Sequence, residues 1–146
     1  MLDIKIVRTT EPKAKPQDES KLGFGKIFTD HMFIMDYDAG QGWHDARIVP
    51  YQPLELDPAA MVFHYAMESF EGLKAYTTED GSIVTFRPDL NAERMMNSAS
   101  RLEMPPFPKE RFLEAVDQVV RANAAWVPPY GSGATFYLRP YMFASG

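Results

Sequence analysis

The segment "ATFYLRPYMF", residues Ala134 to Phe143, decides the fold because it is almost wholly apolar and aromatic, with one guanidinium at its centre. This composition predicts a strand with at least one buried face. A buried cation needs a partner, so Arg139 is either an ion-paired strand residue or a group held ready for an anionic ligand.

Alternate side chains of a strand share a face, and this rule divides the segment into two sets. One set, fit for a core, contains Phe136, Leu138 and Met142. The opposite set places two phenols beside a guanidinium and contains Tyr137, Arg139 and Tyr141. Such a face can bind a carboxylate, with the rings giving apolar contact and cation–π support. The ordinary alternative is a strand face on which Arg139 pairs with a sheet neighbour.

The composition limits the classes of function. The chain has 146 residues, an apolar fraction of 45% and a net charge of −5, which is typical of one globular domain. No basic tract points to nucleic acid or an anionic membrane, and no cysteine is present for disulfides or thiolate metal sites. The three histidines lack metal-ligand spacing. Since no apolar run of membrane-spanning length and no signal or transit peptide is evident, we expect a cytoplasmic protein.

Local signals give an order of elements for the rest of the chain. Asp57 before Pro58 is typical of a helix start, and Asp80-Gly81 is typical of a hairpin turn. Met95, Ala99 and Leu102 share one helix face, as do Leu113, Val116 and Val120 in a later helix. We predict a loosely ordered segment at 1–22, strands at 31–37 and 46–56, helices at 58–70, 88–104 and 108–126, and a hairpin at 73–88.

Strands and helices are clustered in this order rather than strictly alternating. Such clustering favours an α+β fold, with a mainly antiparallel sheet and helices packed on it. We expect residues 23–146 to form that domain.

Three further side chains could take part in chemistry. Tyr65 could reach a pocket from a helix, although such a tyrosine is more often half-buried in a core. Arg94 lies beside the buried stripe of its helix, where it either extends to solvent or forms a fixed fork for a phosphate. Lys74, between apolar residues, suggests a Schiff-base lysine, but strand alternation turns it easily to solvent.

Four motifs together resemble one family. "FGKIFTDHMFIMDYD", "FHYAMESFEGLKAY", "FRPDLNAERMMNSASRLEMP" and "YLRP" occur in the order and spacing of branched-chain amino acid aminotransferases. These are pyridoxal 5′-phosphate enzymes of fold type IV, and the resemblance runs from about Phe24 to the last residue. It implies transfer of the amino group of leucine, isoleucine or valine to 2-oxoglutarate, giving a branched 2-oxo acid and glutamate.

The resemblance also implies roles for individual residues. Arg94, in the "RM" pair, matches the arginine that binds the cofactor phosphate. Four residues match positions that line the substrate pocket: Phe24, Tyr65, Tyr137 and Arg139. On this interpretation Arg139 meets the distal carboxylate of glutamate at the edge of an apolar pocket.

The family further implies a small N-terminal domain, represented here, and a large C-terminal domain that is absent. The lysine that carries the cofactor lies in that second domain, and none of the seven lysines here matches it. We therefore expect no catalytic residue in this chain and no transamination by it alone. The family forms homodimers, in which the neighbouring subunit helps to close the pocket.

Two alternatives stay open. One is another fold-type-IV enzyme, such as a D-amino acid aminotransferase or an aminodeoxychorismate lyase, although these lack the long motif pattern. The other is a free-standing binding module derived from the small domain, without catalysis. An unfinished apolar surface after the last strand would argue against that module.

Overall fold

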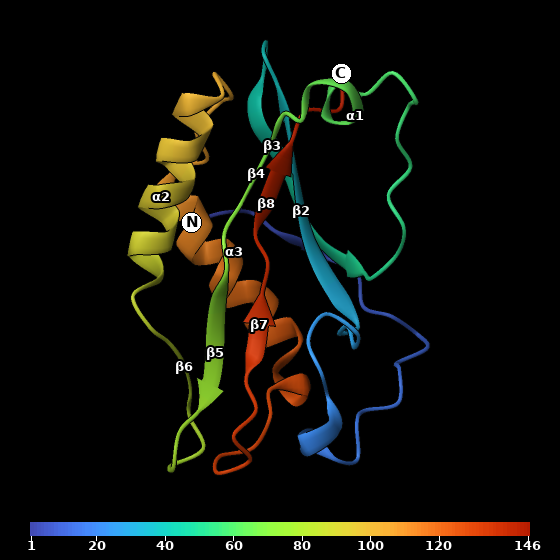
Figure 1. The fold of residues 1–146 in the computed structure, drawn as a ribbon, viewed down its shortest axis with the longest axis vertical. Coiled ribbons are helices and arrows are strands. Elements are labelled where there is room, and N and C mark those ends of the chain that lie inside the picture. The colour runs from blue at the N-terminus through green and yellow to red at the C-terminus, as the bar shows by residue number, and fades with distance from the viewer.

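The computed structural model describes residues 1–146 and confirms an α+β fold (Figure 1). Helix α2 (Pro88–Arg101) lies beside the strands, and helix α3 (Lys109–Ala122) lies behind them. Proline at the first position of α2 fits the predicted start of that helix, since its missing N–H would be unpaired there in any case. The two helices pack on each other, α2 also contacts β4 (Glu68–Phe70), and α3 contacts β2 (His31–Asp38).

The organising feature is a long antiparallel ribbon made of four short strands. Strand β4 pairs with β8 (Tyr141–Phe143), and β5 (Leu73–Thr77) pairs with β7 (Phe136–Leu138). Phe70 faces Tyr141 and Leu73 faces Leu138, so both pairs keep one register across the two-residue gap in each strand. Figure 1 shows β4 and β8 continuing the line of β5 and β7.

Pro140 explains the gap in this ribbon. The backbone N–H of Glu71 donates to the Pro140 carbonyl at 2.8 Å, as an antiparallel pair requires. Proline has no N–H to return that hydrogen bond, so the ladder breaks at this pair. The predicted single strand at 134–143 is therefore two strands, β7 and β8.

A second sheet lies beside the ribbon. Strand β2 pairs antiparallel with β3 (Gly42–Pro50), and β1 (Lys5–Ile6) adds to β3 in parallel. Strand β3 begins four residues before the predicted start at Ala46, because the turn needs only Ala39 to Gln41. Residues 51–56, predicted to continue that strand, are irregular.

The predicted hairpin at 73–88 is confirmed. Strand β5 pairs with β6 (Ile83–Thr85), with Thr77 opposite Ile83. Gly81 between them has a φ of 85°, a conformation that glycine adopts without steric cost. The ribbon and β6 thus form one continuous set of antiparallel neighbours.

The predicted helix at 58–70 is wrong beyond its first turns. Helix α1 covers only Met61–Tyr65, and Ala66 ends it in the left-handed conformation with a φ of 50°. Asp57 does not cap the helix, because its Oδ1 accepts from the Ala59 N–H in a preceding turn. Residues 68–70 belong to β4, so Gly72 is a residue of the ribbon and not a helix end.

The core lies between the inner face of the ribbon and helices α2 and α3. Met95 and Ala99 are buried there as predicted, but Leu102 lies just past the end of α2 and is exposed. The third helix ends at Ala122, and residues 124–126 form a short 3-10 helix. The core side chains are Leu73, Ala75, Ala92, Met95, Ala99, Met104, Phe107, Phe112, Val116, Val120, Phe136, Leu138 and Met142.

The N-terminal segment makes specific contacts. Besides β1, it contains a 3-10 helix at Glu19–Lys21, which Asp18 caps. The Thr9 N–H donates to His31 Nε2 at 3.0 Å, and the Lys13 N–H donates to Asp30 Oδ1 at 2.8 Å. How loosely ordered residues 1–22 are in solution stays a prediction. No helix of this fold has the length and apolar character that crossing a bilayer requires.

Candidate functional site

Arg139 lies on the outer face of the ribbon, at the break between β7 and β8. The predicted alternation is confirmed, since Phe136, Leu138 and Met142 are buried while Arg139 is exposed. Its guanidinium has no carboxylate partner. Its one hydrogen bond runs from Nη2 to the Tyr137 hydroxyl at 3.1 Å. The ion pair with a sheet neighbour, which was the ordinary alternative, is therefore absent from this structure.

Aromatic rings surround this guanidinium. The Arg139 carbon Cζ lies 4.4 Å from the ring centre of Phe70 and 5.4 Å from that of Tyr137. Phe24 packs edge-on against Tyr137, with 4.9 Å between ring centres and 70° between planes. Four side chains thus form one outer-face cluster: Phe24, Phe70, Tyr137 and Arg139. The structure brings together three of the predicted substrate residues and adds Phe70.

Gly72 makes room for this outer-face cluster. A Cβ at this position would overlap the Tyr137 hydroxyl, so no larger residue fits while Tyr137 keeps its place. The requirement is one of space rather than backbone conformation. Gly72 therefore allows the hydroxyl to lie over the backbone and meet Arg139.

Arg94 lies on the opposite side of the ribbon, where α2 packs. Its Nε and Nη2 donate to the two carboxylate oxygens of Glu71, at 2.9 Å and 2.6 Å. Hydrogen bonds from Arg94 are the main cause that lowers the pKa of Glu71, against the opposing effect of burial. The same pairing raises the pKa of Arg94. The guanidinium is a fixed fork rather than a mobile surface group, yet 64% of the side chain is exposed.

Tyr65 lies apart from both groups. It is 73% exposed at the end of α1, so it is not the half-buried core residue of the alternative interpretation. Its nearest ring neighbour is His64, with 6.5 Å between ring centres, and no hydrogen bond joins it to Arg139 or Arg94. Lys74 is exposed on the outer face, opposite Tyr137.

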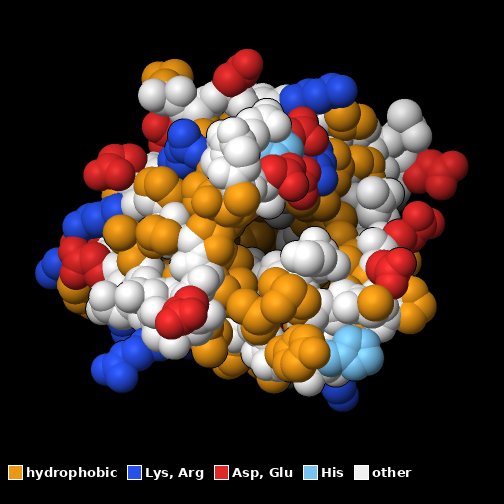
Figure 2. Space-filling view, turned by 90° about the horizontal axis from the view of Figure 1, so that it is seen from above, with side chains coloured by type: hydrophobic (Ala, Val, Ile, Leu, Met, Phe, Trp, Pro, Cys, Tyr) orange, Lys and Arg blue, Asp and Glu red, His pale blue; other side chains and the backbone are white.

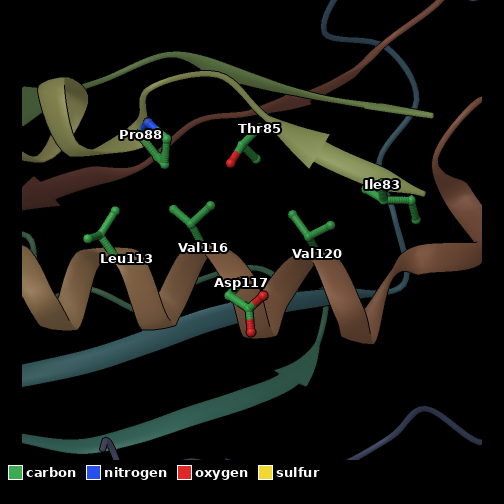
Figure 3. A pocket seen from close by; sticks show the side chains of 7 residues that line it. All are labelled: Ile83, Thr85, Pro88, Leu113, Val116, Asp117 and Val120. Carbon is green, nitrogen blue, oxygen red and sulfur yellow. The ribbon is translucent and has the colours of Figure 1, made fainter. Parts of the chain in front are cut away.

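Two shallow hollows open elsewhere on the surface. One, of about 270 Å³, has a mainly apolar lining of Leu54, Leu56, Val62, Phe63, Glu68, Tyr141 and Phe143. Figure 2 looks onto that end of the molecule and shows hydrophobic side chains gathered around a depression. The other, of about 250 Å³, lies between β6 and α3, where Leu113, Val116 and Val120 point toward the strand while Asp117 points away (Figure 3).

None of the predicted site residues lines either hollow. The outer-face cluster is instead an open wall, in which Phe24 is 68% exposed and Phe70 is 57% exposed. Aromatic side chains at this level of exposure form half of a pocket at most. A second surface has to cover them before a small molecule can be enclosed.

The sequence reasoning missed Phe70 and Glu71. Both fall at the end of the segment that was predicted to be helical, where their orientations could not be derived. The signal was present in the sequence, because Phe70, Lys74 and Tyr76 alternate with Ser69, Glu71 and Ala75 at the period of a strand.

Comparison with known proteins gives consistent matches. The sequence is 50% identical over 147 residues to the branched-chain-amino-acid aminotransferase of Mycobacterium tuberculosis (strain H37Rv), covering 99% of this chain and 40% of that protein. It is 51% identical to branched-chain-amino-acid transaminase 1 of Bacillus subtilis (strain 168), covering 94% of this chain and 38% of the relative. The chain thus spans about 40% of the length of the curated relatives that it matches. No protein-family model matches it.

Solved structures agree with this result. The branched-chain aminotransferase of the archaeon Thermoproteus uzoniensis, solved with norvaline, matches with a TM-score of 0.56 and 27% identity. The match covers 68% of this chain and 31% of that one. The Escherichia coli enzyme matches with a TM-score of 0.56 at 23% identity and supports the fold alone.

Proposed function

This chain belongs to the branched-chain amino acid aminotransferase family, and we propose that it supplies the substrate-facing wall of a pyridoxal 5′-phosphate-dependent active site. The full protein would convert leucine, isoleucine or valine and 2-oxoglutarate into branched 2-oxo acids and glutamate. The relatives' names support the reaction. The proposed residues of the wall are Phe24, Tyr65, Tyr137 and Arg139, together with Phe70.

The observation that carries this proposal is the state of Arg139. A guanidinium on a strand face normally takes a carboxylate partner from its own protein. Here it has only the Tyr137 hydroxyl and two ring faces. A cation in this setting is available to a carboxylate that comes from outside the chain.

The outer-face cluster suits two kinds of substrate in one place. Phe24, Phe70 and Tyr137 offer apolar area, and burying an aliphatic side chain against such area contributes about 1.5–3 kcal/mol. When glutamate or 2-oxoglutarate binds instead, Arg139 can donate to the distal carboxylate. When an aliphatic side chain occupies the site, the Tyr137 hydroxyl keeps Arg139 hydrogen-bonded and lowers the cost of the unused charge.

The residues around Arg94 fit the phosphate of the cofactor. An exposed guanidinium that is fixed by a buried carboxylate can offer its remaining N–H groups to an anion without further ordering. When bound, pyridoxal phosphate supplies the electron sink for amino-group transfer. In this chain Arg94 would hold the phosphate, while the outer-face cluster would orient the substrate and exclude water.

The exposure of the wall supports the remaining parts of the proposal. A large C-terminal domain would bring the cofactor-linked lysine and cover the outer-face cluster. A second subunit of a homodimer would help to close the pocket, and the assembly would act in the cytoplasm. The chain alone would not transaminate, because none of its lysines matches the cofactor-linked position.

The test is to incubate the full-length protein with pyridoxal phosphate and record visible absorption and transamination. We expect a cofactor chromophore and 2-oxoglutarate-dependent turnover of L-leucine, but none of D-alanine. A protein without the chromophore would contradict the enzyme assignment and favour a binding module. Turnover of D-alanine without L-leucine would favour another fold-type-IV enzyme.

A further inference from the structure

Glu71 is a buried carboxylate at the break of the ribbon. Its side chain is 7% exposed, and it lies on the inner face, toward α2. A buried charge persists only when it is paired and hydrogen-bonded. Its partners therefore indicate why the chain keeps it there.

The side-chain partners of Glu71 lie on α2. Arg94 donates to Oε1 and Oε2 through two parallel hydrogen bonds. Asn91 donates from Nδ2 to Oε2 at 3.0 Å, and its Nδ2 is also 3.1 Å from the Gly72 carbonyl oxygen. Two carboxylate oxygens thus accept three hydrogen bonds, an arrangement that only a carboxylate can satisfy.

This pairing uses one edge of the Arg94 guanidinium and leaves the other. Nε and the near hydrogen of Nη2 point to Glu71. Because the fork is planar and rigid, fixing one edge also fixes the direction of Nη1 and of the second Nη2 hydrogen. Those N–H groups have no protein partner.

We propose that Glu71 is a positioning residue for the cofactor phosphate, acting through Arg94. This inference rests on the proposed function, in which Arg94 binds that phosphate. Glu71 holds the guanidinium so that its free edge is ordered before the anion arrives. Asn91 ties the same carboxylate to the backbone beside the outer-face cluster, so the two anion sites are fixed to one point of the ribbon.

Charge and orientation make opposite predictions for removal of the carboxylate. A negative group beside an arginine weakens its attraction for phosphate, so loss of the charge alone would tighten binding. Loss of orientation would weaken binding, because Arg94 would have to be ordered when the phosphate binds. The sign of the change therefore identifies the role.

The experiment uses the full-length holoenzyme and the variant Glu71→Gln. Dissociation constants for pyridoxal phosphate and for phosphate-free pyridoxal are measured by absorption, with thermal unfolding as a check on folding. We expect pyridoxal phosphate to bind roughly tenfold more weakly, the size of one charge-assisted hydrogen bond, and pyridoxal to change by less than about twofold. Glu71→Asp, which keeps the carboxylate on a shorter stem, should recover part of the loss.

The matched control is Glu93→Gln. Glu93 neighbours Arg94 on the same helix, but its carboxylate pairs with Lys109 at 2.7 Å and does not contact Arg94. This substitution removes the same charge without removing the orientation, so pyridoxal phosphate affinity should not fall.

Two outcomes for Glu71→Gln would overturn the inference: unchanged or tighter binding of pyridoxal phosphate, or equal weakening of pyridoxal phosphate and pyridoxal. Arg94→Ala separates this failure from that of the proposed function. If Arg94→Ala weakens pyridoxal phosphate and Glu71→Gln does not, only the positioning role is wrong. If neither variant weakens it, the phosphate role of Arg94 is wrong as well.

Discussion

Gly72 is the residue at which the geometry of the outer face is most sensitive. Its backbone lies directly beneath the Tyr137 hydroxyl, and that hydroxyl is the one hydrogen-bond partner of Arg139. A single methyl group at position 72 therefore acts on a side chain across the ribbon and, through it, on the guanidinium.

We expect Gly72→Ala to lower the free energy of unfolding by about 1–3 kcal/mol, because overpacking forces Tyr137 to move. The measurement is chemical denaturation of the full-length protein. Gly40→Ala is the control, since a Cβ at Gly40 meets no atom within 4 Å. If both variants lose the same stability, the close approach of Tyr137 has no energetic consequence.

At the residue scale, the sequence predicted whatever depended on strand alternation alone. It placed Arg139 and Tyr137 on one face and the core side chains on the other, and the structure confirms this. It did not predict the pairing of Arg94 with Glu71. That contact joins residues 23 positions apart, and it depends on how α2 packs against the ribbon.

At the scale of elements, two prolines misled the sequence reasoning in opposite ways. Asp57-Pro58 is typical of a helix start, but the helix that follows runs only from Met61 to Tyr65. The segment from Glu68 onward pairs with β8 instead, because strand pairing outweighs local propensity there. Pro140 lies inside an apolar run, and its missing N–H divides a strand that composition alone predicts to be continuous.

Asp30 connects the N-terminal segment to the rest of the fold. Its Oδ1 accepts from the Lys13 N–H at 2.8 Å, and its Oδ2 accepts from Trp126 Nε1 at 2.9 Å. The hydrogen bond from Lys13 is the main cause that lowers the pKa of Asp30. This carboxylate is therefore expected to hold the N-terminal segment against the strand that follows it.

We expect Asp30→Asn to lower the free energy of unfolding by about 1–3 kcal/mol and to speed proteolysis before Lys13. Because the folded pKa is below the ordinary value of 3.8, the stabilisation is complete above that value and is lost as pH falls through the folded pKa. The difference from wild type should thus shrink in acid. Limited proteolysis and a pH series of unfolding curves measure this, with exposed Asp3→Asn as the control.

An equal effect of both substitutions, or a difference that grows in acid, would contradict the role of Asp30. Unchanged proteolysis would indicate that residues 1–22 are loosely ordered despite their contacts.

At the scale of the whole molecule, the ribbon presents a different arginine on each side. Arg94 is fixed on the side of α2, and Arg139 is surrounded by rings on the outer face. The fold class could be predicted from the clustered order of elements. The division into three sheets could not, because it depends on the break at Pro140 and on the parallel addition of β1.

The central claim is that the outer face receives both an aliphatic side chain and a carboxylate, and that Arg139 serves only the second. The direct measurement is the single-turnover rate of each half-reaction in the full-length holoenzyme carrying Arg139→Met, with exposed Arg101→Met as the control. We predict that the rate with L-glutamate falls at least roughly tenfold more than the rate with L-leucine, as expected for a lost charge-assisted hydrogen bond. Equal losses with both substrates would contradict the claim.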